Sequence, residues 1–342
     1  MTTTSQNKLT WDILIIIFFI SVLILFQLGI FITGSFPHFN SDKTQSYLKK
    51  INDGFSGNIL FTGDSGGFYE LTGCERIGST SRRAALLNKF TPYVYLDFGN
   101  FTSAGISRNK TTLPLIAHSY LSMHLNAINL TEKDWIHLND TEDTREDKSL
   151  HFLPFVSANL EIKDNNFLGN EIPKFIFIPF LLTRKSESKE IILGITGITE
   201  HAKRLYGKDT VFSVREIIPA LKEVKPLLSR TDIKILLFDG SFFSLKKMIN
   251  ENDLGFDLVI SNATLPDHVD KCISINNTRV FTCDEHGRSL SNIRVIKYKD
   301  GYNYIFDTLI TGMGAPEDEG IKSLIMKMEQ EALKRKKLEK KP

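Results

Sequence analysis

The sequence has few cysteines, little excess of charge of either sign and only one long hydrophobic run. Its three cysteines include no Cys-x-x-Cys pair, which gives no support to a zinc cluster or a covalently attached haem. Lys and Arg number 42 against 40 Asp and Glu, so the composition gives no reason to expect nucleic-acid binding. A hydrophobic fraction of 42% and a charged fraction of 24% exclude a disordered chain and a disulfide-stapled miniprotein. A bridge between Cys272 and Cys283 is compatible with an oxidising compartment, but the sequence does not establish it.

The one long hydrophobic run lies near the start of the chain, at residues 13–33, and carries no charge. At about 1.5 Å rise per residue, a helix of this length matches a hydrocarbon core of about 30 Å. A cleaved signal peptide has a shorter apolar core and a small-residue cleavage site, to which this segment is a poor match. We therefore expect a single transmembrane anchor at residues 11–34, after a short tail (1–10) and before a polar linker (35–56).

The charges beside the anchor do not fix its orientation. Lys8 and the terminal amine precede the anchor, whereas Lys43, Lys49 and Lys50 follow it, so the positive-inside rule gives no clear answer. We place the globular domain on the extracytoplasmic, periplasmic side of the membrane, mainly because of the family resemblance described below.

A basic tail ends the chain. Residues 334–341 hold six basic residues and one acid, so the rest of the chain carries a formal charge of −3. The apolar spacing before this tail predicts a helix within a C-terminal region at residues 313–342. We favour a solvated helix end, whose cations suit the helix dipole. The alternative is a basic arm that contacts anionic lipid or an acidic partner.

Between the linker and the C-terminal region, short β-rich segments alternate with helical patterns. This alternation favours an α/β domain, and the last strands, which follow one another without helices, indicate an antiparallel element. The predicted strands are residues 58–62, 93–97, 152–157, 175–183, 191–196, 234–238, 257–261, 279–283, 292–298 and 303–309; the predicted helices are 80–89, 113–127, 213–229 and 244–252.

Two short motifs imitate well-known catalytic sites. Residues 63–67 read GDSGG, as around the nucleophile of chymotrypsin-like proteases, but only His38, in the linker, precedes Ser65 as a base. Residues 97–99 read DFG, the metal-binding triplet of kinases, but too little chain precedes them for the required glycine-rich loop, strand lysine and catalytic loop. We reject both interpretations.

The order of several segments resembles the metallophosphatase domain of 5′-nucleotidases and UDP-sugar hydrolases, which are calcineurin-type phosphoesterases. NILFTGDSGG is similar to the family's first strand and its D-x-H-G loop, and YVYLDFGN to its L-L-D-A-G-D strand and turn. IKILLFDGSF stands where the family has L-L-S-H-L-G, and DLVISNATLPD where it has D-L-I-I-G-G-H-S-H-T. The resemblance covers residues 57–312 and implies a four-layer α/β/β/α sandwich of two mixed sheets.

The resemblance also implies positions for two metal ions, which in the family activate water and stabilise the phosphoryl charge. The family's ligands are Asp, His, a bridging Asp, Asn and three further His. Here Asp64 matches the first aspartate, and Glu132 and Asp239 are possible substitutes, because each carries a carboxylate that could bind a metal. Asn100 stands at the bridging position, where a neutral amide cannot supply the shared negative charge.

The other ligand positions are worse suited to a hard cation. The family's G-N-H-E loop corresponds to Thr131, Glu132, Lys133 and Asp134, so that Lys133 places a cation where the family has its catalytic histidine. The remaining histidine positions hold Gly66, Ala263 and Leu265, none of which has a side chain that can bind a metal.

Two arginines, Arg82 and Arg83, open the helix predicted behind the Asp64 loop. One of them is a candidate contact for an anion or for the Asp64 carboxylate. We slightly favour a structural ion pair that supports the loop.

We therefore expect a membrane-anchored metallophosphatase-like protein that is catalytically degenerate and has no metal cofactor. It would serve as a structural or interaction subunit, with a protein partner in the membrane or envelope. The alternative is an active phosphoesterase or 5′-nucleotidase with a remodelled, mononuclear site. That site would use Asp64, Asn100, Glu132 and Asp239 to hold one divalent ion such as Mn, Fe or Zn.

Overall fold

The computed structural model describes most of the chain from Gly54 onward. The described residues are 54–65, 80–90, 92–102, 112–139, 148–162, 171–200, 212–264, 271–282, 289–299, 301–311 and 314–339. The chain divides into two compact units, residues 1–54 and 55–342, and all the described helices and strands belong to the second. The predicted anchor and nearly all of the predicted linker lie outside the described residues, as does Cys283. No helix in the described ranges is long and apolar enough to cross a membrane.

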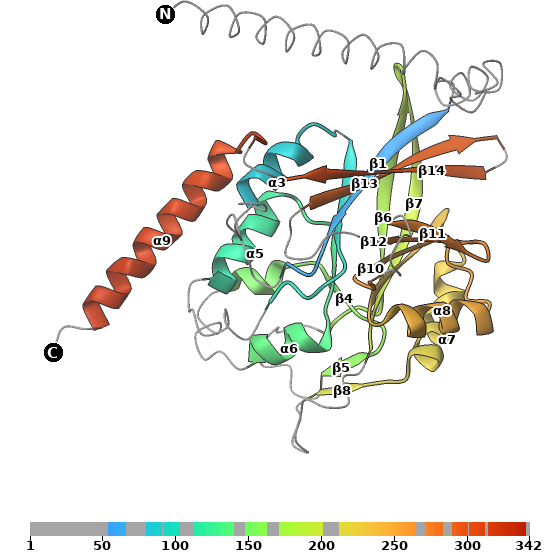
Figure 1. The fold of residues 1–342 in the computed structure, drawn as a ribbon, viewed down its shortest axis with the longest axis horizontal. Helices are drawn as coiled ribbons and strands as arrows, with labels where there is room; N and C mark the ends of the chain where they lie inside the picture. The colour runs from blue at the N-terminus through green and yellow to red at the C-terminus, as the bar shows by residue number, and fades with distance from the viewer. Residues whose placement is uncertain are drawn as a thin grey trace, which may run out of the picture. The chain divides into compact units, whose positions relative to one another are not determined.

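Within the described residues, twelve strands form one large mixed sheet (Figure 1), which confirms the predicted mixed α/β class. Six strands, in the order β11-β12-β10-β9-β7-β6, form one half, and β14-β13-β1-β2-β3-β4 form the other. One residue pair, Ser56 with Thr183, joins β1 to β6 and thus the two halves. By hydrogen bonding, the two separate sheets that we expected are therefore one sheet. Its strands are β1 (Phe55–Thr62), β2 (Tyr93–Asp97), β3 (Ala127–Asn129), β4 (Phe155–Val156), β6 (Phe175–Arg184), β7 (Glu187–Thr199), β9 (Ile233–Asp239), β10 (Leu258–Ser261), β11 (Cys272–Ile275), β12 (Thr278–Thr282), β13 (Ser289–Tyr298) and β14 (Gly301–Ile310).

Three groups of buried apolar side chains lie between the layers of helices and strands. The second group lies between the halves of the sheet, where Ile59 and Phe61 of β1 join Ile235 of β9. Leu60 points the other way, because successive side chains alternate between the faces of a strand, and it joins the first group. That group includes buried side chains of α3 (Thr80–Leu87), α5 (Thr112–Ser122) and α9 (Glu319–Glu339). The third group packs α7 (Ile217–Leu228) and α8 (Phe242–Glu251) on the opposite half, so the layers run helix, strand, strand, helix.

The C-terminal helix α9 packs on the same core as α3 and α5 through Ile321 and Ile325. Asp318 precedes it, and its carboxylate accepts a hydrogen bond from the Ile321 backbone N–H at 2.9 Å, which caps the helix start. The Asp318 N–H in turn donates to the Ser81 carbonyl at 2.9 Å, which ties this cap to α3. The cap and the apolar contacts fix where α9 begins.

Several elements differ from the prediction. Residues 131–134, expected as a loop, start a helix, α6 (Glu132–Asn139), where the Thr131 hydroxyl accepts a hydrogen bond from the Asp134 N–H at 3.1 Å. The helix predicted at residues 213–229 begins at Ile217, after the short strand β8 (Phe212–Val214). β8 pairs with β5 (Leu160–Ile162) in a separate two-stranded sheet, and both strands were missed. A 3-10 helix, Lys148–Phe152, precedes β4.

Candidate functional site

The candidate residues follow strands whose carboxyl ends gather at the same edge within each half of the sheet. β1 and β2 are parallel, and the loops after them carry Asp64 and Asn100. β7, β9 and β10 are also mutually parallel, and β9 ends at Asp239. The carboxyl ends of parallel strands are where α/β sheets usually place ligand-binding residues. The carboxyl ends of these strands are therefore suitable positions for a ligand-binding site.

The loops after β1 and β2 have a strained and closely coupled backbone. Asp64 and Asn100 have φ angles of 48° and 57°, in the left-handed region that Asp and Asn tolerate better than most residues. The Asp64 N–H donates to the Gly99 carbonyl at 2.8 Å, which holds the two loops together. Gly99 has a φ of 103°, and a Cβ there would clash with the Thr131 side chain. Only glycine fits this turn.

Asp239 is buried and accepts three side-chain hydrogen bonds. Its Oδ1 accepts from Asn100 Nδ2 at 2.8 Å and from Asn262 Nδ2 at 2.6 Å. Its Oδ2 accepts from Thr199 Oγ1 at 2.9 Å. The structure therefore brings two of the predicted positions, Asn100 and Asp239, into direct contact across the two halves of the sheet. These amide and hydroxyl donors compensate for the loss of water around the buried Asp239 carboxylate.

Asn262 was missed by the sequence analysis. It follows β10 directly, and its Oδ1 also accepts a hydrogen bond from the Gly240 N–H at 3.0 Å. Its position as the first polar residue after a buried strand, next to the expected histidine pair, was the available signal. Ala263, at one of those histidine positions, is buried, and its N–H donates to Ser261 Oγ at 2.9 Å.

Asp134 supports the loop after β2. It is fully buried, and its carboxylate accepts hydrogen bonds from the Asn100 N–H and the Thr131 hydroxyl, both at 2.8 Å. The other oxygen accepts from the N–H and the hydroxyl of Thr102, both at 3.0 Å. Burial raises the pKa of Asp134 to about 7, although these donors oppose the shift. All four donors favour a carboxylate that receives hydrogen bonds rather than one that binds a cation.

Glu132 and Lys133, two further predicted positions, differ in burial. Glu132 is buried and its N–H donates to Thr199 Oγ1 at 3.2 Å, whereas the Lys133 side chain is exposed. Gly66 and Leu265 lie outside the described residues. Among the residues that the structure describes, no three His, Cys, Asp or Glu side chains are grouped so as to hold a metal ion. The donor chemistry at Asn100 and Ala263 does not fit a dinuclear centre, because an amide and an alanine stand where an anionic and an imidazole ligand are required.

The two arginines of α3 have separate contacts. Arg82 donates to the Ala315 carbonyl at 3.1 Å and forms an ion pair with Glu317 at 3.0 Å, just before α9. Arg83 is buried and donates to the Tyr95 hydroxyl at 3.3 Å. Burial alone would lower the pKa of Arg83, but Tyr95, Tyr120 and Asp97 outweigh it and raise the pKa. Both arginines thus have structural contacts.

Asp97, at the end of β2, is the acidic member of the buried cluster around Arg83. Its carboxylate accepts hydrogen bonds from Tyr120 Oη at 2.8 Å, the Gly99 N–H at 2.8 Å and Thr62 Oγ1 at 3.1 Å. Burial raises the pKa of Asp97, against these hydrogen bonds and the charge of Arg83. This cluster lies directly beneath the loop that carries Asn100.

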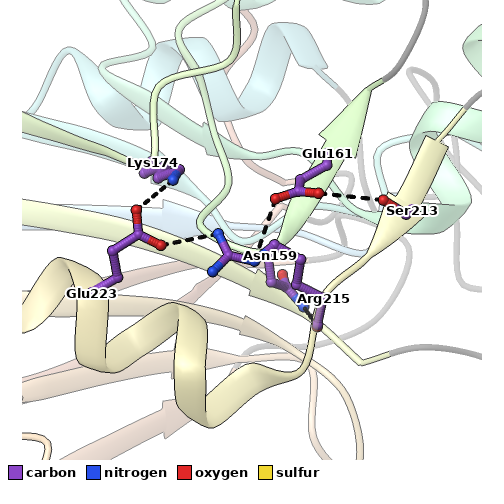
Figure 2. Close-up of polar contacts among 6 residues, drawn as sticks. All are labelled: Asn159, Glu161, Lys174, Ser213, Arg215 and Glu223. Atoms are coloured by element: carbon purple, nitrogen blue, oxygen red, sulfur yellow. Dashed lines mark hydrogen bonds and ion pairs between the residues drawn. The ribbon is translucent and has the colours of Figure 1, made fainter.

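A brace of polar contacts joins Asn159, Glu161, Lys174, Arg215 and Glu223 (Figure 2), and its buried member Asn159 holds the Thr199 end of β7. Asn159 Nδ2 donates to the Thr199 carbonyl at 2.8 Å and the Arg215 carbonyl at 3.1 Å, and its Oδ1 accepts from the Thr199 N–H at 3.0 Å. The Arg215 guanidinium pairs with Glu161 at 3.3 Å and Glu223 at 3.0 Å, and Lys174 pairs with Glu223 at 2.5 Å. Because Thr199 donates to Asp239, the brace positions a residue of the candidate site.

Replacing Asn159 by alanine is expected to lower the free energy of unfolding by about 2–3 kcal/mol, because it leaves backbone groups of Thr199 and Arg215 without partners. Urea denaturation measures the loss. Arg215→Met is the matched control, since it removes only partly exposed ion pairs, which contribute about 0–1 kcal/mol. Equal losses in the two variants would show that Asn159 is not the main link.

Solved structures of several hydrolases share this fold. A 5′-nucleotidase precursor from Thermus thermophilus superposes with a TM-score of 0.62 at 16% identity, over 82% of this chain and 59% of that one. A calcineurin-like phosphoesterase from Bacillus subtilis gives 0.62 at 15% identity, over 82% of this chain and 99% of that one. A sulfate thiohydrolase from Thermus thermophilus gives 0.61 at 14% identity, over 80% and 60%.

These likenesses confirm the predicted metallophosphatase-like fold, and at such low identity they show the fold alone. The chain spans about three fifths of the length of the 5′-nucleotidase precursor. No protein-family model matches the sequence, and no curated protein matches it.

Proposed function

We propose that this chain, whose domain has a metallophosphatase-like fold, is a membrane-anchored and catalytically degenerate member of that structural group. It acts as a structural or interaction subunit of a membrane-associated assembly, with its domain on the extracytoplasmic side. The 21-residue uncharged apolar run at residues 13–33 supports the anchor.

The hydrogen bonding of Asp239 is the observation that carries the proposed loss of chemistry. A carboxylate in a dinuclear centre directs its lone pairs at cations, which activate water. Here two amide N–H groups, from Asn100 and Asn262, point at the same oxygen of Asp239 at 2.8 Å and 2.6 Å. A metal ion on that oxygen must displace both donors, and neither amide can replace the missing negative charge.

A specific observation also favours the alternative, an active phosphoesterase with a mononuclear site. The loops that carry Asp64 and Asn100 keep a left-handed backbone, which costs about 1–3 kcal/mol per residue and is concentrated at functional sites. In that alternative, Asp64, Glu132 and Asp239 would supply the ligands and Asn100 would assist. The two functions differ in metal content and in activity.

The full-length chain, purified in detergent, separates these functions. Elemental analysis for Mn, Fe and Zn, combined with assays of nucleotide and phosphodiester hydrolysis, is expected to show far less than one metal ion per chain and no hydrolysis above background. Asp64→Ala and the exposed-site control Asp253→Ala are expected to match the wild type in both measurements. A stoichiometric metal ion that is lost together with activity in Asp64→Ala alone would overturn the degenerate assignment. A protein that co-purifies at a fixed ratio would identify the assembly.

A further inference from the structure

Three segments meet at the end of the sheet where the described chain begins. Phe55, the first residue of β1, pairs with Lys297 of β13, and Ser56 pairs with Thr183 of β6. The guanidinium of Arg184 lies 4.5 Å from the centre of the Phe55 ring. The start of β1 therefore lies beside the β6–β7 turn and the β13–β14 turn (Figure 1). We call this surface, formed by residues 55–56, 182–189, 294–299 and 301–302, the basic end.

The basic end has a charge opposite to that of the rest of the domain. Residues 182–189 and 294–300 hold six basic residues and two acids, whereas the chain without its tail carries −3. The basic residues are Arg184, Lys185, Lys189, Arg294, Lys297 and Lys299, and the acids are Glu187 and Asp300.

Some of these charges are already compensated within the domain. Arg184 pairs with Glu187 at 2.5 Å, and Lys297 donates to Tyr302 Oη at 2.6 Å. One acid from a neighbouring segment, Asp232, reaches the basic end by accepting from Tyr302 Oη at 3.1 Å. The side chains of Lys185, Lys189 and Lys299 are exposed; Lys185 and Lys299 lie at the two turns, and Lys189 lies near the start of β7. The basic end therefore exposes three lysine side chains on its surface.

The connection of the basic end to the proposed anchor favours a membrane surface as its partner. Phe55, at the end of the predicted linker, starts β1, so in an anchored chain the basic end is the part of the domain next to the tether. A tether of this kind raises the local concentration of the tethered surface. Basic clusters next to a membrane anchor are attracted to anionic lipid headgroups, and the attraction falls off within a Debye length.

We propose that the basic end docks on anionic lipid headgroups and thereby sets the orientation of the domain relative to the membrane. This inference rests on the anchoring part of the proposed function. The contact is electrostatic, and it requires the exposed lysines at the two turns.

Hydrogen exchange on the full chain in vesicles tests this docking. The chain is reconstituted into phosphatidylcholine vesicles with and without about 30% phosphatidylglycerol. Amides at residues 184–189 and 298–302 are expected to exchange several-fold more slowly on the anionic vesicles, and about 1 M salt is expected to abolish the difference. The triple variant Lys185→Glu, Lys189→Glu, Lys299→Glu is expected to show no slowing. Lys246→Glu with Lys247→Glu, on α8 and away from the basic end, is the control that keeps it (Figure 1).

Three outcomes are decisive. Equal exchange on the two kinds of vesicle would overturn the docking proposal, and so would slowing that is confined to the basic tail at residues 334–341. Flotation of the chain with neutral vesicles tests the anchor separately, because neutral lipid offers no attraction to lysines. A chain that fails to float there, yet binds anionic vesicles through the two turns, would refute the anchor and leave the basic end as a lipid-binding surface.

Discussion

The Asp134→Ala variant is expected to lose about 3–5 kcal/mol of its free energy of unfolding. The substitution removes the acceptor for two backbone N–H groups, those of Asn100 and Thr102, and for the hydroxyls of Thr102 and Thr131. Each buried donor without a partner costs about 1–3 kcal/mol, and the hydroxyls recover part of the loss by rotating. Urea denaturation at neutral pH, monitored by circular dichroism, measures the change.

Asp134→Asn separates the acceptor role from the charge. One oxygen is retained, but the new NH2 group must face donors from Thr102 or from Asn100, so the expected loss is smaller than in the alanine variant but well above zero. Asp253→Asn, at a largely exposed acid, is the control and is expected to change stability by less than about 0.5 kcal/mol. A loss in Asp134→Ala no larger than in this control would show that the four hydrogen bonds are not needed.

The stability of the wild-type protein is also expected to depend on pH through Asp134. Its pKa is about 7 in the folded protein against 3.8 in the unfolded chain, so the folded state holds this proton more tightly between those values. The stability from this proton is present below about pH 4 and is lost as pH rises to about 7, at up to about 1.4 kcal/mol per pH unit. The pKa of Asp97 is raised in the same direction. Asp134→Asn is expected to flatten the pH profile, and an unchanged profile would contradict the assignment.

Much of the fold could be predicted because it depends on local sequence. The segment YVYLD was predicted as a strand at residues 93–97 and is β2, since its aromatic and β-branched residues suit a pleated, buried surface. The order of the strands then placed Asn100 and Asp239 at related positions, and the structure brings them into contact at 2.8 Å. Segment order was informative where single motifs were not.

The parts that could not be predicted depend on contacts between distant segments. The sequence T-E-K-D at residues 131–134 has the form of a capping box, which signals a helix start, but the family loop at this position favoured a different interpretation. The role of Asp134 depends on donors more than thirty residues away, and no spacing rule reveals such a partner. The contact between Asn262 and Asp239 likewise joins residues that are 23 positions apart, and no spacing rule predicts it. The short strands β5 and β8 have three residues each and leave little periodicity to detect.

The Arg83→Met variant is expected to lose about 3 kcal/mol, because it removes both the donor to the buried Tyr95 hydroxyl and a nearby positive charge that favours the buried Asp97 carboxylate. Methionine keeps most of the apolar stem, so the loss reports the charge more than the packing. Arg82→Met, one residue away, is the control. Its ion pair with Glu317 is partly exposed, so about 1 kcal/mol is expected.

A double-mutant cycle shows whether Arg83 acts through Asp97. Removing both charges, in Arg83→Met with Asp97→Asn, leaves no buried ion, and the amide can still accept a hydrogen bond from Tyr120. The double variant is therefore expected to be more stable than Arg83→Met alone, with a coupling energy above about 1 kcal/mol. Without the charge of Arg83, the pKa of Asp97 rises further, so the loss of stability with rising pH is expected to continue to a higher pH in Arg83→Met than in the wild type. Additive losses with an unchanged pH profile would show that the cluster is held by Tyr95 and packing, and that the charge of Arg83 contributes little.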